Sequence, residues 1–137
     1  MRRIGDSSLF IGHVGDLRDV RSLHAAGIAA VVDLAANEAP AALTRDLIYC
    51  RLPLVDGAGN PEWLLRAAVM LLATFVRDDV PCLVCCSAGM SRSPAVAAAA
   101  LARARSMPAK EALEQVAAVG AIDVSPGLWQ EVEDVIE

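Results

Sequence analysis

A cysteine and an arginine stand at the two ends of a short run of small residues, Cys86-Ser87-Ala88-Gly89-Met90-Ser91-Arg92. An apolar segment precedes the cysteine, and Pro94 follows the arginine, where a proline is typical of the first turn of a helix. A loop between a strand and a helix can curl so that its backbone N–H groups converge on one point at the positive end of the helix dipole. We therefore expect residues 87–92 to bind a phosphate group. The side chains of Ser87, Ala88, Gly89, Met90 and Ser91 should leave room for it inside the curled loop.

Three residue types in this run suit phosphoryl transfer. The field that holds phosphate also stabilises negative sulfur, so we expect Cys86 to be a thiolate near neutral pH and to act as a nucleophile. Arg92 can hold two phosphate oxygens through its planar fork. Gly89 permits the positive φ that such a curl requires. The Cys–Arg spacing is weak evidence alone, and its position between a predicted strand and a predicted helix makes it specific.

An acid and a hydroxyl complete the predicted site. Asp56 precedes Cys86 by 30 residues on the turn-rich stretch 56–60, and its carboxyl group could protonate the leaving oxygen and later activate water. Ser93 could donate a hydrogen bond to the departing sulfur. Purely structural roles stay open as alternatives. Asp56 would then be an ordinary turn residue, Ser93 a helix cap, and Cys86 with Arg92 a buried thiol and a surface arginine.

The elements that must position these residues alternate along the chain. Apolar or β-branched runs predict strands, and cap and breaker residues predict helices, with Asp16 and Asn60 as expected caps. The expected strands cover residues 9–12, 28–34, 47–52 and 81–85, and the expected helices cover residues 16–26, 61–77, 94–105, 108–119 and 125–136. This order predicts an α/β fold with a central, mostly parallel, twisted sheet of four to five strands and helices on both faces.

Length and composition narrow the function classes. A chain of 137 residues suits one domain, 1–137, and a net charge of −5 argues against nucleic acid or an acidic membrane as a partner. The sequence has no apolar run of membrane-spanning length and no signal-peptide pattern, so we expect a cytoplasmic protein with free thiols. We expect Arg2-Arg3 to be a solvated tail, and Trp63 and Trp129 to anchor the core.

With these motifs in place, the sequence resembles the dual-specificity branch of the cysteine-based protein phosphatases, in particular its small atypical members. The resemblance covers nearly the whole chain, because residues 9–12, 28–34, 52–56, 86–94 and 124–129 follow in the family's order. It implies that Cys86 is the nucleophile, Arg92 the phosphate clamp, Asp56 the general acid and Ser93 the hydroxyl for breakdown of the intermediate. It also implies a shallow pocket and no metal or other cofactor.

One position departs from the family pattern. The family usually has histidine immediately before the nucleophile, and this chain has Cys85 there. That histidine helps to hold the loop and to ionise the nucleophile by hydrogen bonding, for which a thiol is a weak substitute. We therefore expect an active but slower enzyme whose Cys86 ionises less readily than in relatives that have the histidine.

The other cysteines invite alternative functions. Cys82 and Cys85 form a Cys-x-x-Cys pattern, but residues three apart in a strand face opposite sides, so core packing is favoured over zinc or thioredoxin-like chemistry. A disulfide from oxidised Cys86 to Cys85, Cys82 or Cys50 would protect the nucleophile, and this idea stays open.

The predicted activity is hydrolysis of a phosphomonoester. The expected substrate is a protein carrying phosphotyrosine or phosphoserine/threonine, or a small phosphate ester, since the loop has no cation beyond Arg92 for a polyanionic ligand. A non-catalytic phosphopeptide-binding module and a rhodanese-like sulfurtransferase are the alternatives. The sequence predicts neither the physiological substrate nor the oligomeric state.

Overall fold

Five strands form one sheet in the order β1-β2-β5-β3-β4. The computed structural model describes residues 1–136. Short β1 (Arg2–Arg3) pairs antiparallel with β2, and all the other neighbours are parallel. These strands are β2 (Leu9–His13), β3 (Ala30–Ala35), β4 (Ile48–Leu54) and β5 (Cys82–Cys86). The prediction of a central, mostly parallel sheet of four to five strands is confirmed.

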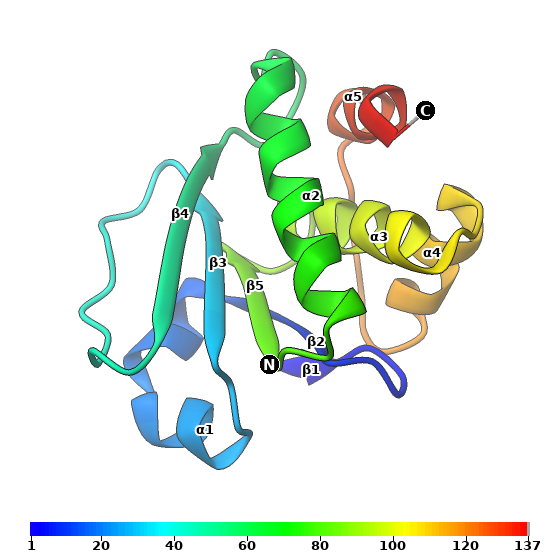
Figure 1. Cartoon of the computed structure of the whole chain (residues 1–137). Helices are drawn as coiled ribbons and strands as arrows, with labels where there is room; N and C mark the ends of the chain where they lie inside the picture. The colour runs from blue at the N-terminus through cyan, green and yellow to red at the C-terminus, as the bar shows by residue number, and fades with distance from the viewer. Residues whose placement is uncertain (137) are drawn as a thin grey trace.

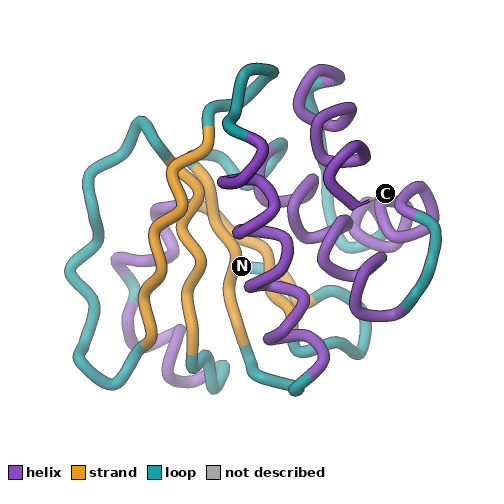
Figure 2. Tube along the Cα trace, turned by 45° about the horizontal axis from the view of Figure 1, so that its top comes forward, coloured by secondary structure: helices purple, strands orange, loops and turns teal. Residues whose placement is uncertain are grey.

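Helices cover both faces of this sheet, as the sequence predicted (Figure 1). The 3-10 helix η1 (Val14–Arg18) and helix α1 (Val20–Ala25) lie on one face. The other face carries α2 (Glu62–Arg77), α3 (Arg92–Arg105), α4 (Ala109–Ala117) and α5 (Pro126–Ile136), which stand together in Figure 2. Each face has its own hydrophobic core, and the larger one lies under α2–α5.

Helix α3 is the centre of the helical layer. Every residue from 92 to 102 is buried, because the helix contacts the sheet as well as α2, α4 and α5. Its alanines let these neighbours approach closely, and they leave little side-chain entropy to lose on burial. The first residue of α3, Arg92, is therefore fixed by a helix that is packed on all sides.

Two expected helix caps are wrong. The Asp16 carboxylate accepts a hydrogen bond from the backbone N–H of His13 (3.0 Å), which closes η1, and Asp19 caps α1 by accepting from the N–H of Ser22. Asn60 does not cap α2 either. Its side chain bonds both backbone groups of Val55 and the carbonyl of Gly57, so it closes the 55–60 turn. Both side chains bond backbone groups that precede them in the chain and not the first turn of the helix that follows.

Two further expectations are also wrong. Arg2 and Arg3 pair with Ile11 and Phe10 as strand β1 and do not form a solvated tail. Trp63 is 69% exposed on the first turn of α2, because the apolar face of that helix is filled by its other side chains. Trp129 does pack against the main core.

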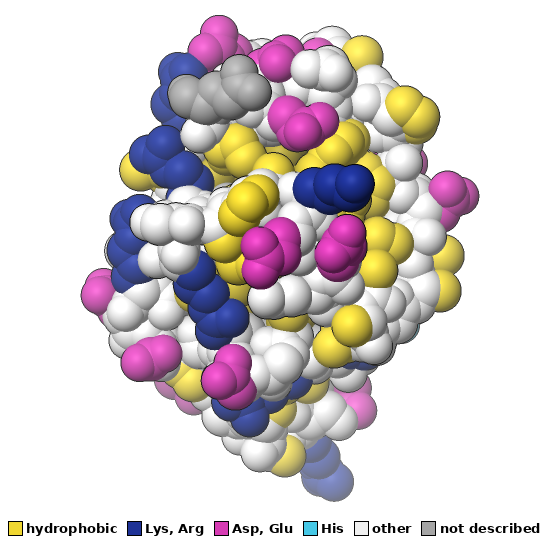
Figure 3. Space-filling view, turned by 90° about the vertical axis from the view of Figure 1, so that its right-hand side faces the viewer, with side chains coloured by type: hydrophobic (Ala, Val, Ile, Leu, Met, Phe, Trp, Pro, Cys, Tyr) yellow, Lys and Arg dark blue, Asp and Glu magenta, His cyan; other side chains and the backbone are white. Residues whose placement is uncertain are grey.

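The surface over the helical layer has charges of both signs. Figure 3 shows Lys and Arg along its left-hand edge and acidic side chains beside them, with hydrophobic atoms between. None of the helices within residues 1–136 is both long and apolar enough to cross a membrane.

Candidate active site

The Cys86–Arg92 segment forms a tight loop at the carboxyl end of the sheet. Cys86 is the last residue of β5 and is 2% exposed, and Arg92 is the first residue of α3. Gly89 has a φ of 72°, as the curl was expected to require, and a Cβ there would lie 2.8 Å from the carbonyl oxygen of Gly12. The backbone N–H of Ser93 points at the Cys86 sulfur (3.5 Å). The sulfur thus lies where the loop meets the amino end of the helix, and that end favours negative charge.

The Arg92 guanidinium is held by three uncharged oxygen atoms. Its Nη1 donates to the Asn37 side-chain oxygen (3.0 Å) and to the Leu54 carbonyl (2.9 Å), and its Nη2 donates to the Ser87 hydroxyl (3.0 Å). None of its partners among residues 1–136 is a carboxylate, so Arg92 brings a positive charge to the loop that no ion pair offsets.

Asp56 reaches the same loop from the turn after β4. Its Oδ1 accepts hydrogen bonds from the hydroxyls of Ser91 (2.5 Å) and Ser125 (3.1 Å). The Ser91 hydroxyl in turn accepts from the backbone N–H of Ser125 (3.0 Å). Three segments that are far apart in sequence, the 56–60 turn, the loop and the start of α5, are therefore tied at one point.

These residues line one cavity of about 270 Å³. Its walls are formed by the sulfur, the guanidinium and two exposed carboxylates, Asp56 and Asp123. The backbone N–H of Asp123 donates to the carbonyl of Met90 (2.7 Å), which fixes this segment against the loop. The lining consists of Asp56, Cys86, Ser87, Ala88, Met90, Ser91, Arg92 and Asp123.

Ser93 follows Arg92 in α3, and its backbone N–H lies 3.5 Å from the Cys86 sulfur. Its side chain is 0% exposed, and its hydroxyl has no hydrogen-bond partner among residues 1–136. Leaving a buried hydroxyl unpaired costs roughly 1–3 kcal/mol.

The cysteines of β5 face alternate sides, as expected. Cys82 and Cys86 belong to the core under α2–α5, and Cys85 belongs to the core under α1. Burial raises the pKa of the Cys82 thiol to about 12. Burial, with the neighbouring Asp33 carboxylate, raises the pKa of the Cys85 thiol still further. Both thiols are thus held protonated, and within residues 1–136 no group of His, Cys, Asp and Glu side chains is arranged to hold a metal ion.

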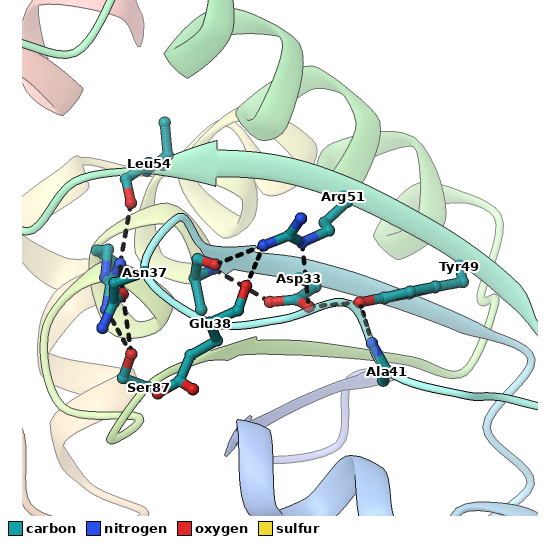
Figure 4. Close-up of polar contacts among 10 residues, drawn as sticks. Asp33, Asn37, Glu38, Ala41, Tyr49, Arg51, Leu54 and Ser87 are labelled. Carbon is teal, nitrogen blue, oxygen red and sulfur yellow. Dashed lines mark hydrogen bonds and ion pairs between the residues drawn. The ribbon is translucent and has the colours of Figure 1, made fainter.

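A second polar network supports the loop that carries Asn37 (Figure 4). Asp33 is 1% exposed, and its carboxylate accepts from the Tyr49 hydroxyl (2.6 Å) and lies 3.9 Å from Arg51 Nε. Arg51 Nη2 donates to the carbonyls of Ala35 (3.2 Å) and Glu38. Burial and the bond to Asp33 raise the pKa of Tyr49, which keeps its hydroxyl a donor.

Sequence reasoning missed Asn37, Ser125 and Asp123. Asn37 is 55 residues from Arg92, and Ser125 is 69 residues from Asp56. Asn37 lies in the loop shortly after the predicted buried strand 28–34, at the edge where parallel strands place ligand-binding loops, and this was the available signal.

The central strand ending in a cysteine, the loop of small residues and the arginine that opens a buried helix together define the cysteine-based phosphatase class. The catalytic-domain model of the dual specificity phosphatases matches residues 9–134, so the chain belongs to that family.

Individual relatives agree with this assignment. The chain is 27% identical over 131 residues to human dual specificity protein phosphatase 15, covering 92% of this chain and 43% of that protein. It thus spans less than half the length of that relative. The crystal structure of human DUSP28 superimposes with a TM-score of 0.87 at 25% identity, covering 99% of this chain and 95% of that one. A mouse putative dual specificity phosphatase, solved in complex with zinc tungstate, gives 0.86 at 27% identity over 98% and 84% of the two chains.

Proposed function

We propose that this chain hydrolyses phosphomonoesters through a covalent phosphocysteine on Cys86, and that its substrates are proteins phosphorylated on tyrosine, serine or threonine. One observation carries the proposal. Cys86, Arg92 and Asp56 line a single cavity of about 270 Å³. Nucleophile, charge clamp and proton donor are the three groups that such a transfer requires.

In the proposed first step, the Cys86 thiolate attacks phosphorus and the bond from phosphorus to the ester oxygen breaks. Arg92 and the loop N–H groups stabilise the charge on the three equatorial oxygens. The leaving oxygen takes a proton from Asp56. That proton belongs on Oδ2, because Oδ1 already accepts two hydroxyl hydrogens.

In the second step, water attacks the phosphocysteine. The Asp56 carboxylate takes a proton from this water, the sulfur–phosphorus bond breaks, and inorganic phosphate forms. The sulfur leaves as thiolate and is stabilised by the Ser93 backbone N–H, which lies 3.5 Å away. The unpaired Ser93 hydroxyl is the proposed second donor to it.

Charge at the cavity favours a substrate with one phosphate. Arg92 is the single cation among the lining residues, and Asp56 and Asp123 contribute two carboxylates. Repulsion from the carboxylates grows with the charge of the ligand, so a ligand with several neighbouring phosphates is disfavoured more than the single phosphate of a phosphorylated side chain. Tungstate is a tetrahedral oxyanion like phosphate, so the tungstate complex of the mouse relative supports an oxyanion site in this fold.

Turnover of p-nitrophenyl phosphate tests the proposal. Wild type should give vanadate-sensitive turnover, Cys86→Ser should give none, and Asp56→Ala should lower kcat by ~10²–10⁴ if the carboxyl group acts as a general acid and base. Retained phosphopeptide binding without any turnover would instead identify a binding module. Transfer of sulfur from thiosulfate to cyanide would identify a sulfurtransferase.

A further inference from the structure

Asn37 provides one of the three oxygen atoms that bind the Arg92 guanidinium. An arginine side chain has five N–H donors: one on Nε and two on each Nη. Both Nη1 hydrogens are used, by Asn37 and by Leu54, and one Nη2 hydrogen is used by Ser87. Within residues 1–136 this leaves the Nε hydrogen and one Nη2 hydrogen. These two lie on the same edge of the guanidinium plane, where a pair of phosphate oxygens can accept both.

The three contacting groups form a closed ring. The Asn37 oxygen accepts from Arg92 Nη1 (3.0 Å) and from the Ser87 hydroxyl (3.1 Å), and the same hydroxyl accepts from Arg92 Nη2 (3.0 Å). Ser87 and Arg92 are the first and last residues of the loop, so Asn37 joins its two ends. Removing the Asn37 oxygen would free one donor of Arg92 and leave the Ser87 hydroxyl without its acceptor.

The loop that carries Asn37 is itself fixed. Arg51 donates hydrogen bonds to the carbonyls of Ala35 and Glu38, which lie on either side of Asn37 in the chain. The Tyr49 hydroxyl accepts from the N–H of Ala41 (3.0 Å). Both of these side chains contact the buried Asp33 carboxylate in β3. Figure 4 shows two groups of contacts, one around Asp33 and one around Asn37, which the backbone from Asn37 to Glu38 connects. Asn37 is therefore held in place before any ligand arrives.

We propose that Asn37 is a positioning residue that sets the rotation of the Arg92 guanidinium, so that the Nε/Nη2 edge faces the bound phosphate. The proposal rests on the proposed function for its role in catalysis, but it also predicts simple anion binding. Because Asn37 touches neither the sulfur nor the proposed proton donor, its effect on phosphate should pass through Arg92.

A double-mutant cycle tests this route, with inorganic phosphate as the probe and isothermal titration calorimetry as the measurement. Asn37→Ala should weaken phosphate binding about tenfold, as expected for one lost hydrogen bond to a charged group. In the Arg92→Lys background, Asn37→Ala should change phosphate affinity by less than ~2-fold, because the guanidinium that Asn37 orients is absent. Thr44→Ala, a polar truncation in the same connecting segment, is the matched control and should leave binding unchanged.

A spectroscopic readout covers the case in which Arg92→Lys binds phosphate too weakly to measure. Two nitrogens held by different acceptors should give separate Arg92 Nη resonances in ¹⁵N NMR of wild type. In Asn37→Ala they should broaden or merge because the guanidinium rotates. Alkylation of Cys86 by iodoacetamide should not change.

Two results would overturn the proposal: an equal loss of phosphate affinity in both backgrounds, or unchanged Arg92 resonances in Asn37→Ala. Neither readout needs turnover. A wild type that binds phosphate without hydrolysing p-nitrophenyl phosphate would contradict the proposed function and leave the role of Asn37 intact.

Discussion

At the residue scale, Cys85 is the position where this chain departs from the usual family pattern. Its thiol lies in the core under α1, and its register partner on β3 is Asp33. Neighbouring residues of parallel strands point to the same side, so a polar side chain at position 85 would face that carboxylate. A protonated thiol gives Asp33 only a weak donor and holds the end of β5 chiefly by packing.

Replacing Cys85 with histidine should make Cys86 react at lower pH. The imidazole ring N–H could donate to Asp33, and a partly charged ring next to the nucleophile would favour the thiolate. The measurement is the rate of iodoacetamide alkylation of Cys86 against pH in wild type and in Cys85→His. A thermal melt checks that the larger side chain is accommodated, and superimposable alkylation profiles in a folded variant would refute the idea.

At the element scale, the Cys86–Arg92 loop packs against a strand, β2, that contributes no residue to the cavity. Gly89 packs directly on the carbonyl of Gly12 near the end of β2, and Arg2 of β1 reaches the Gly89 carbonyl from the other side (3.5 Å). The Gly89 carbonyl thus has a hydrogen-bond donor from outside the loop. The arrangement explains why an N-terminal segment expected to be free is instead an edge strand.

Gly89→Ala should open the loop. A Cβ would lie 2.8 Å from a backbone oxygen, and the residue would also keep a φ of 72°, which alanine adopts only with strain. We expect kcat/KM for p-nitrophenyl phosphate to fall by about 10² or more, as for other small displacements of a reacting geometry.

Gly27→Ala is the control for destabilisation in general. Gly27 has a φ of 74° but nothing within 4 Å of its would-be Cβ, and it follows α1 away from the cavity. The substitution should cost ~1 kcal/mol of stability with unchanged kcat/KM. Equal losses of activity in both variants would show that general destabilisation, and not the contact between the loop and β2, lowers the activity of Gly89→Ala.

At the scale of the whole molecule, the buried thiols make stability depend on alkaline pH. The pKa of Cys82 rises from 9.0 to about 12 on burial, and that of Cys85 rises further. Below pH ~9 both folded and unfolded chains keep these protons, and the stabilisation is fully present. Above it the unfolded chain loses protons that the folded chain retains, so folding is progressively disfavoured toward the folded pKa.

The free energy of unfolding should therefore fall above pH ~9 by up to about 1.4 kcal/mol per pH unit for each thiol. Urea unfolding at neutral pH and at several values between ~9 and ~11 measures it. Cys82→Ala removes one titrating group. The free energy of unfolding of this variant should therefore fall less steeply with pH, by the contribution of one proton, whatever its absolute stability. Parallel slopes in the two proteins would contradict this account of the buried thiol.

Local residue patterns in the sequence determined the buried strands, the curled loop and the candidate acid of this protein. Unbroken apolar runs such as 28–34 predicted buried strands, since only a strand covered on both faces tolerates them. The small residues between Cys86 and Arg92 predicted the curled loop, because its shape depends on backbone freedom within a few residues. Asp56 was found through its position on a glycine-rich turn.

Only the tertiary structure decided which distant groups meet these residues. Asn37 at the Arg92 guanidinium, Ser125 at Asp56 and Asp123 at the cavity wall come from loops and a helix start whose own sequences carry no periodic signal. Short polar side chains also choose among nearby backbone partners by small energy differences, which is why Asp16 and Asn60 close turns and do not cap helices. The periodicity of apolar residues reflects whether each side chain is buried or exposed to solvent. The geometry of the site depends instead on how the packed sheet brings separate loops to one edge.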